Sequence, residues 1–463
     1  MLKKGFRFLV LFLMLLSILV SCSKGENTAE KSSMEKSTMT KASGSNQMSI
    51  YIPENDTLLL NAVAEFNSKN MNSQIAVNEF NYATGIEEIR NKITTALTVG
   101  EGPDIIYWID DRMFPSVRKM LESGAFCDLN TLIEKDPEIK LSDYNRTVLN
   151  SGIINGKRYA IPLSYTIPSL WTTKNILARN NIRIDSSKWT WKDFFAEAKK
   201  YMDKNKGRKN YFVVYPSDAP QYIMGDICSS LVNYKNKKTN FNSSKFIGFL
   251  KDYKAVSASF CPSDENVTGK EFKNSIINNS IVTSSTYGYI SPDIMFNLNS
   301  ELAKWLREEV FILGNPSLDE SSHKSAYPNR VIGINSNCKS KEKAFDFIKI
   351  LLSEGYQSSQ YVHSIPVSIK GYTNAVDRVT SASAARGDKV SQLGGDWVDP
   401  VPLPSQAVKN LGDIISSINN CNIVDSKIVE IVSAEVTEYL KSNRSAEATA
   451  KIIDDKVLLY LNE

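Results

Sequence analysis

The spacing between apolar residues changes several times along the N-terminal third of the chain. Each change predicts the start of a new strand or helix. Residues 48–52 and 75–80 form short β-prone runs, which predict two strands. Apolar residues recur at helical spacing over 58–66 and again over 86–97, which predicts two helices. A continuous apolar run at 105–109, bounded by turn residues, predicts a buried strand. This alternation of strand and helix indicates an α/β sheet.

The loop after the third predicted strand carries candidate chemistry. Ligands of open α/β sheets bind beyond the carboxyl ends of the strands. Trp108, Asp110 and Asp111 reach this position, where a ring can stack on a sugar and carboxylates can accept hydrogen bonds from its hydroxyl groups. In the competing interpretation, Trp108 is a core residue and the two aspartates begin a solvated helix. The sequence thus proposes these three as ligand-binding residues.

The first 21 residues predict a signal peptide. Lys3, Lys4 and Arg7 precede an apolar run over 8–20, which is too short to span a membrane comfortably. The run ends in Leu-Val-Ser-Cys, which resembles the bacterial lipobox, and this resemblance implies that Cys22 is lipidated. The alternative is an ordinary signal peptide with an incidental cysteine.

Residues 22–47 are polar, lack aromatic residues and predict a flexible tether. With a lipidated cysteine, this tether would hold the exported protein on the outer face of the cell membrane. The net charge is +4 and three basic residues lie in the predicted signal peptide, so the remaining chain is close to neutral and no nucleic-acid partner is indicated. The cysteines after Cys22 are scattered, which favours buried free thiols and leaves one disulfide open.

A family resemblance extends over most of the chain after the tether. It rests on Pro103-Asp104 before the strand, the Gly-Ala-Phe-Cys-Asp-Leu run at 124–129, Ile-Pro at 161–162, and the helical segments at 189–202 and 339–352. Two predicted terminal helices, around 428–440 and 446–461, complete the order. This order resembles bacterial extracellular solute-binding proteins of ABC importers, in the oligosaccharide-binding group. One departure is a Thr-Thr pair at 172–173 where the family has Tyr-Asn.

The resemblance implies a two-lobe α/β fold, like that of periplasmic binding proteins, with hinge crossings and a central cleft. The chain length of 463 residues allows two to three domains. We expect residues 48–160 plus 283–335 to form lobe 1, and residues 161–282 plus 336–463 to form lobe 2. The chain would then cross between the lobes three times, which permits closure about a hinge.

The same resemblance adds three aromatic residues to the expected site. Tyr165 lies just beyond Ile-Pro on the first crossing. Tyr287, with Tyr289 as the alternative, follows a predicted strand at 280–285 in a loop that faces the cleft in the family. Trp397, in a Gly-Gly-Asp-Trp loop, is expected to be a lid, a cleft aromatic or a hinge plug. The competing interpretation makes each of them a core or surface residue.

The implied function is that of a lipid-anchored solute-binding component that passes a carbohydrate, expected to be an oligosaccharide, to an ABC permease. We expect a monomer with no cofactor. We expect no metal ion either, because the two histidines, His323 and His363, have no further metal-ligating residues near them in the sequence. No recognised catalytic motif is present, so the protein is not expected to be an enzyme. The alternatives are a surface carbohydrate-active enzyme, an adhesin, and a binding protein for a peptide or a cationic solute such as a polyamine.

Overall fold

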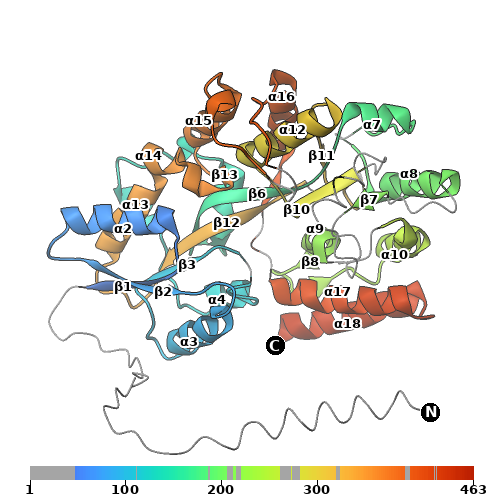
Figure 1. The fold of residues 1–463 in the computed structure, drawn as a ribbon. Helices are drawn as coiled ribbons and strands as arrows, with labels where there is room; N and C mark the ends of the chain where they lie inside the picture. Colours follow the sequence, from blue (N-terminus) through green and yellow to red (C-terminus); the bar gives the residue numbers. More distant parts are fainter. Residues whose placement is uncertain are drawn as a thin grey trace, which may run out of the picture. The chain divides into compact units, whose positions relative to one another are not determined.

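The computed structural model has a mixed α/β fold (Figure 1), in agreement with the predicted class. It describes residues 47–463 apart from 111, 186–187, 206–211, 215–220, 261–272, 274–281, 320–323, 392–396, 422 and 424. The predicted signal peptide, Cys22 and all but the last residue of the predicted tether therefore lie outside the described residues.

A single sheet runs through the described part in the order β2-β1-β3-β12-β6-β10-β7, with three further strands attached to it. Its strands are β1 (Met48–Pro53), β2 (Ile75–Phe80), β3 (Ile105–Trp108), β6 (Ile161–Thr172), β7 (Val213–Val214), β10 (Val282–Ile290), β11 (Phe311–Gly314), β12 (Ser325–Ile334), β13 (Ile365–Pro366) and β14 (Asn420–Cys421). Two short hairpins pair β4 (Ile153–Ile154) with β5 (Lys157–Arg158) and β8 (Val232–Asn233) with β9 (Lys238–Thr239).

The helices are α2 (Thr57–Lys69), α3 (Ile86–Thr98), α4 (Val117–Glu122), α5 (Asn130–Lys135), α6 (Arg146–Leu149), α7 (Lys174–Arg179), α8 (Trp191–Lys204), α9 (Gln221–Leu231), α10 (Ser244–Val256), α12 (Pro292–Leu306), α13 (Lys341–Leu352), α14 (Glu354–Gln357), α15 (Ile369–Thr380), α16 (Ser405–Ser417), α17 (Ser426–Lys441) and α18 (Ala446–Asn462). The predicted order of three strands and two helices at the start of the fold is confirmed by β1, α2, β2, α3 and β3. Strands β2 and β3 both pair in parallel with β1, as the alternation requires.

Strand β3 is covered on both faces, which explains its continuous apolar run. Ile105 and Tyr107 of β3 point into one core, which also holds residues of α2 and α13. Ile106 and Trp108 point the other way, into a smaller core shared with α3 and α4. Figure 1 shows α2 and α3 on opposite sides of this part of the sheet. We call these the first core and the minor core.

Strand β6 joins the two halves of the sheet. Its beginning pairs with β12, from Ile161 to Thr166, and its end pairs with β11 and β10. The sequence predicted a crossing between lobes at this segment, and the structure forms the crossing from one long buried strand. Strand β10 extends to Ile290, beyond the predicted end at 285, so the expected loop around Tyr287 is part of a strand.

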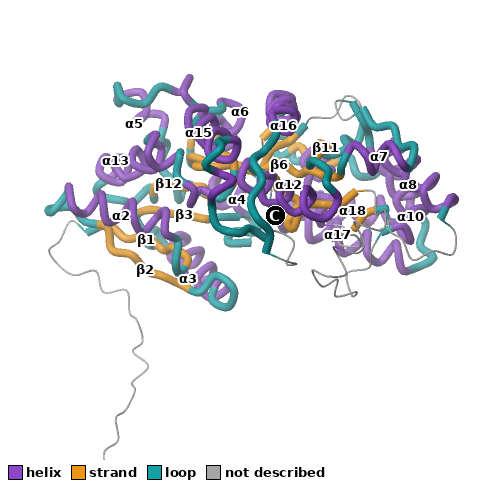
Figure 2. Tube along the Cα trace, turned by 45° about the horizontal axis from the view of Figure 1, so that its top comes forward, coloured by secondary structure: helices purple, strands orange, loops and turns teal. Residues whose placement is uncertain are grey.

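The second core lies among α8, α9, α10, α17 and α18, which are grouped in Figure 1. Figure 2 shows α8, α10, α17 and α18 together from another side. Helix α8 begins with a capping box in which Thr190 and Asp193 satisfy each other's backbone N–H groups. Trp191 and Phe194 then turn inward from the first turn of α8. The amphipathic pattern predicted for 189–202 thus forms one wall of this core.

The segment after β12 contributes to both large cores. Helix α13 packs against α2, and Phe347 belongs to the first core. Cys421 is still in the first core, whereas Ile428 is in the second. The chain therefore passes from the first core to the second between these two residues. The amphipathic face of α13 predicts burial but does not identify the sheet face that covers it.

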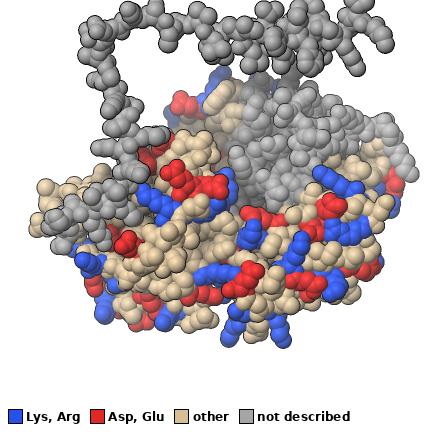
Figure 3. Space-filling model, turned by 90° about the horizontal axis from the view of Figure 1, so that it is seen from below, with Lys and Arg blue, Asp and Glu red and all other residues tan. Residues whose placement is uncertain are grey.

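Charges and thiols agree with the sequence analysis where the structure describes them. On the face shown in Figure 3, basic and acidic side chains are interspersed. Cys127, Cys228, Cys338 and Cys421 are free, and burial raises the pKa of each thiol. Cys261 lies outside the described residues.

Candidate functional site

The parallel strands β1, β2 and β3 end at one edge of the sheet, and polar residues follow each of them. Glu54 follows β1, Asn81 and Tyr82 follow β2, and Asp110 and Arg112 follow β3. This edge is where open α/β sheets bind their ligands. We call these five residues the strand-end cluster.

Asp110 is the centre of this cluster. The Tyr82 hydroxyl donates to Asp110 Oδ1 at 2.7 Å, and Arg112 Nη2 donates to Asp110 Oδ2 at 2.8 Å. The Arg112 guanidinium also lies 5.0 Å from the centroid of the Tyr82 ring, which is a cation–π contact. Beside it, Asn81 Nδ2 donates to Glu54 Oε2 at 3.2 Å.

The cluster is open to solvent, and hydrogen bonds between its members hold their side chains in position. The Arg112 side chain is 68% exposed and that of Asp110 is 29% exposed. The hydrogen bond from Arg112 to Asp110 raises the pKa of the guanidinium, and burial raises the pKa of the Tyr82 phenol. The arrangement offers a solute guanidinium donors, carboxylate acceptors and part of an aromatic face.

Two of the predicted site residues are placed in the protein core. Trp108 is 4% exposed, and its ring centroid lies 5.8 Å from that of Phe114 and 6.2 Å from that of Phe126. Tyr165 is 2% exposed within β6, and its hydroxyl accepts a hydrogen bond from Asn145 Nδ2 at 3.4 Å. Both residues lie within buried strands and not in the loops that follow them, so the competing core interpretation describes them.

Among the other predicted residues, the structure describes the side chains of Asp110 and Trp397. Asp110 is in the strand-end cluster, whereas Asp111 lies outside the described residues. Tyr287 lies in β10, where its side chain is not described. Trp397 is 68% exposed in the segment before α16.

The sequence analysis missed Tyr82 and Arg112. Both lie just beyond the end of a predicted strand, the same position that identified Asp110. Applying that rule to the second parallel strand would have found Tyr82, and following the loop after the third strand for two more residues would have found Arg112.

A second polar contact joins the minor core to the second core. Asp425, at the start of α17, accepts hydrogen bonds from the backbone N–H of Arg118 at 2.8 Å and from the Tyr460 hydroxyl at 3.1 Å. The backbone N–H of Lys427 donates to Pro115 O at 3.1 Å. Asp425 is 1% exposed, and this burial raises the pKa of its carboxyl group to about 6.

Two cation–π contacts surround this carboxylate. Arg118 lies 4.4 Å from the centroid of the Tyr234 ring, and Lys119 lies 3.9 Å from that of Tyr460. Helix α4 supplies both cations, and the second core supplies both rings. We call the whole arrangement the α4–α17 contact.

Within the described residues, no group of three or more His, Cys, Asp or Glu side chains is arranged to hold a metal ion. The same part of the chain contains no helix with the length and apolar character required to cross a membrane.

The fold is similar to solved binding proteins at low sequence identity. One is an ABC substrate-binding protein from Listeria monocytogenes in complex with cycloalternan, with a TM-score of 0.61, 16% identity, and coverage of 90% of this chain and 99% of that one. The sugar-binding protein MalE from Xanthomonas citri gives a TM-score of 0.64 at 14% identity, covering 90% and 97%. A periplasmic oligogalacturonide-binding protein from Yersinia enterocolitica gives 0.63 at 14%, covering 90% and 99%. At these identities the similarity establishes the two-lobe α/β fold.

Comparison with curated proteins finds no match. The profile of the bacterial extracellular solute-binding protein family, a family of binding proteins and not of enzymes, matches residues 61–380. That match covers more than half of the chain and agrees with the resemblance seen in its motifs. The chain therefore belongs to the bacterial extracellular solute-binding protein family.

Proposed function

We propose that the protein binds a carbohydrate between its two halves and delivers it to an ABC permease. The strand-end cluster carries this proposal, because Tyr82, Asp110 and Arg112 combine an aromatic ring with charged donors and acceptors. Sugars need this combination, since their ring faces are apolar and their hydroxyl groups both donate and accept. The carbohydrates in the names of the similar solved structures support the same class of solute.

The cluster favours a neutral sugar over a cationic solute. Each oxygen of the Asp110 carboxylate already accepts a hydrogen bond from Arg112, whose guanidinium balances its charge. A polyamine approaching Asp110 would meet that guanidinium, and like charges repel. A hydroxyl group can instead join both partners at once.

Binding of the solute would shift the equilibrium between an open and a closed arrangement of the two halves. A solute that touches both halves only in the closed arrangement stabilises that arrangement by its differential affinity. The α4–α17 contact supports this mechanism, because it is a polar contact between the minor core and the second core. We propose that the solute and this contact favour the same closed arrangement.

The boundaries of the lobes follow from the cores. We propose that residues 48–160 and the segment around α12 to α16 form one lobe, and that α8 to α10 with α17 and α18 form the other. Asp111, Tyr287 and Trp397 remain proposed solute contacts. In the sequence, Asp111 stands between Asp110 and Arg112, and Tyr287 is part of β10.

We also propose that the protein is exported and anchored to the outer face of the membrane through lipidated Cys22, and that it acts as a monomer. Cys22→Ser should release the protein from the membrane fraction of the producing cell. Retention of this variant in that fraction would contradict the proposed anchor.

Calorimetry of the purified protein against a panel of neutral oligosaccharides and polyamines tests the solute. We expect one oligosaccharide to bind and Arg112→Ala to weaken it at least tenfold. Arg179→Ala is the matched control, because Arg179 also pairs with a carboxylate, Glu308, at 3.1 Å but belongs to a different part of the fold. Binding of a polyamine in place of every sugar would contradict the proposal.

The enzyme alternative makes a different prediction. Incubation of the bound oligosaccharide with the protein, followed by chromatography, should return the oligosaccharide intact. Shortened products would support a carbohydrate-active enzyme instead.

A further inference from the structure

Asp425 is a buried carboxylate whose partners come from two different cores. Its Oδ1 accepts a hydrogen bond from the backbone N–H of Arg118, in the helix α4 that packs into the minor core. Its Oδ2 accepts one from the hydroxyl of Tyr460 in the second core, and its own backbone N–H donates to the Tyr234 hydroxyl at 3.3 Å. The carboxylate therefore lies where the two proposed halves meet.

Separation of the two halves would remove one side of this environment. Tyr234 and Tyr460 pack with α17 in the second core, so they would stay beside Asp425. The hydrogen bond from Arg118 would be lost, and so would the backbone hydrogen bond between the start of α17 and Pro115. Water would then reach a residue that is 1% exposed in the present arrangement. Asp425 is thus buried when the halves are closed and hydrated when they are open.

Burial is the largest influence on the pKa of Asp425, which rises to about 6. The hydrogen bonds from Arg118 and Tyr460 and the positive charges of Arg118 and Lys119 act in the opposite direction but do not cancel the effect of burial. The other ionisable groups around the contact are Glu122, which pairs with Arg118 at 3.4 Å, Lys427 and Glu430 on α17, Tyr234, Cys228, and the chain end at Glu463. The closed arrangement therefore holds a proton on Asp425 more tightly than the open one.

The contact can hold Asp425 in either protonation state. The ionised carboxylate accepts from Arg118 and Tyr460, as the structure shows. The protonated group can instead donate to the Tyr460 hydroxyl, because a phenol accepts as well as donates, while its other oxygen still accepts from Arg118. Protonation therefore removes the cost of burying a charge without breaking the contact.

We propose that Asp425 takes up a proton when the two halves close, so that mild acid favours closure and strengthens solute binding. This inference rests on the proposed function, because it assumes that the solute is held between the halves. A proton that binds one arrangement more tightly shifts the population toward that arrangement. With a pKa of about 6 in the closed arrangement and the ordinary 3.8 in the open one, the affinity should rise about tenfold from pH 7.5 to pH 5.

Pulsed electron paramagnetic resonance of the full chain measures closure without a solute. Spin labels on Glu88→Cys in α3 and Lys451→Cys in α18 place one exposed label on each half. We expect the population with the shorter label distance to rise at least threefold from pH 7.5 to pH 5. In Asp425→Asn this population should be high at both pH values, because the amide accepts from Arg118 and donates to Tyr460 as the protonated acid does.

Calorimetry with maltotriose, cellotriose and xylotriose then relates closure to binding. Any of these sugars that binds should bind about tenfold more tightly at pH 5 than at pH 7.5. Asp425→Asn should lose this pH dependence and, at pH 7.5, bind at least tenfold more tightly than the unaltered protein. A purely structural role for Asp425 predicts the opposite, since a damaged contact would weaken binding.

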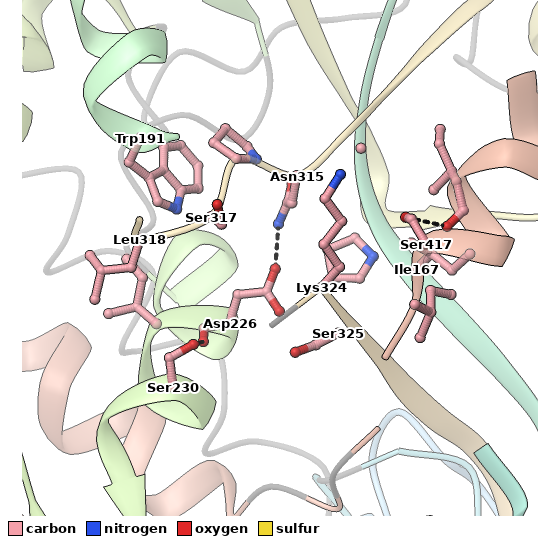
Figure 4. A pocket seen from close by; sticks show the side chains of 16 residues that line it. Ile167, Trp191, Asp226, Ser230, Asn315, Ser317, Leu318, Lys324, Ser325 and Ser417 are labelled. Atoms are coloured by element: carbon pink, nitrogen blue, oxygen red, sulfur yellow. Dashed lines mark hydrogen bonds between the residues drawn. The ribbon is translucent and has the colours of Figure 1, made fainter. Parts of the chain in front are cut away.

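Asp226 provides the matched control, because it is a second buried carboxyl group near the boundary between the first and second cores. Asn315 Nδ2 donates to Asp226 Oδ2 at 3.1 Å (Figure 4), and the Tyr327 hydroxyl donates to Asp226 Oδ1 at 2.8 Å. Burial raises its pKa as well. Its donors lie on β12 and directly after β11, beside the strands that join the halves, and groups near a hinge move least on closure. Asp226→Asn should therefore keep the pH dependence of the unaltered protein.

Three results would overturn the proposal. The label distances of the unaltered protein could be the same at pH 5 and pH 7.5, Asp425→Asn could keep the pH dependence, or Asp226→Asn could abolish it. The pH titration of the labelled protein gives this answer even if a substituted carboxyl group prevents folding. If none of the sugars binds but acid still shortens the label distance, the proton-coupled closure stands and the proposed carbohydrate function fails.

Discussion

The backbone N–H of Arg118 donates a 2.8 Å hydrogen bond to the carboxylate of Asp425, although 307 residues separate them in sequence. The bond joins α4, beside the parallel strands, to the start of α17 in the second core. Tyr460 completes the environment of the carboxylate with a second hydrogen bond. A buried carboxyl group between the minor core and the second core makes their contact sensitive to pH.

Replacing Asp425 by Asn should change how stability depends on pH. Burial raises the pKa of Asp425 in the folded protein to about 6, above its ordinary value of 3.8. The folded state therefore holds this proton more tightly, and the associated stability is present below about pH 4 and lost as the pH rises through 6. The shift corresponds to roughly 3 kcal/mol. Between pH 4 and pH 7.5, we therefore expect the free energy of unfolding of the unaltered protein to fall by roughly 2–3 kcal/mol relative to that of Asp425→Asn.

Denaturant unfolding at several pH values measures this difference. Asp413→Asn is the control, because the Asp413 side chain is 65% exposed and pairs with Lys409 on the surface of α16. Parallel pH profiles for Asp425→Asn and the unaltered protein would show that the carboxyl group is not perturbed as the structure indicates.

Two substitutions of Tyr82 should separate its hydroxyl group from its ring. Tyr82→Phe removes only the 2.7 Å hydrogen bond to Asp110, a loss of about 1 kcal/mol, so we expect affinity for the oligosaccharide to fall about fivefold. Tyr82→Ala also removes the aromatic face and the cation–π contact with Arg112, and should lower affinity further. Calorimetry on both variants measures the two steps. Equal affinities for the two variants would show that the ring does not contact the solute.

The start of the fold could be predicted from periodicity because each element there has a strong local pattern. Residues 105–108 are buried on both faces and read as a continuous apolar run, whereas α3 repeats its apolar residues at helical spacing. These patterns depend on neighbours in the sequence. The predicted bounds of β2 agree with the structure, and those of β1 differ by one residue.

The candidate site was only partly predictable, because burial depends on residues distant in sequence. Trp108 and Asp110 are two positions apart, yet Trp108 packs on Phe126 while Asp110 lies at the open edge of the sheet. The sequence shows that both lie near the end of a strand. It does not show where the strand stops and which face the ring occupies.

Substitution of Trp108 should lower the stability of the fold, whereas substitution of Trp397 should leave stability nearly unchanged. Trp108→Ala would leave a cavity between Phe114 and Phe126, and we expect the free energy of unfolding to fall by roughly 3–5 kcal/mol. Trp397 is 68% exposed, so Trp397→Ala should change stability by less than about 0.5 kcal/mol. If Trp397 covers the bound solute, its substitution lowers affinity without that loss of stability. Unfolding and calorimetry on both variants distinguish a core tryptophan from a binding one.

A buried ion pair beside the first core gives a prediction of a different kind. Arg330 Nη1 lies 2.7 Å from Asp56 Oδ2, with side-chain exposures of 11% and 2%, and the Tyr107 hydroxyl bonds to both residues. Asp56 also caps α2 by accepting a hydrogen bond from the N–H of Leu59. Removing the cation leaves a buried carboxylate without its charge partner, which costs roughly 3–5 kcal/mol. Arg330→Ala should therefore destabilise the protein strongly.

The backbone does not complicate this result, because Arg330 has a φ of 53° and arginine and alanine both carry the Cβ that makes this conformation unfavourable. Arg378→Ala is the matched control: Arg378 pairs with Asp293 at 3.0 Å, but their side chains are 32% and 36% exposed. Water screens that pair, so its loss should cost no more than about 1 kcal/mol. Denaturant unfolding of the two variants compares the loss of an arginine from a buried ion pair with its loss from a partly exposed one. Equal losses would mean that burial does not set the strength of the pair between Asp56 and Arg330.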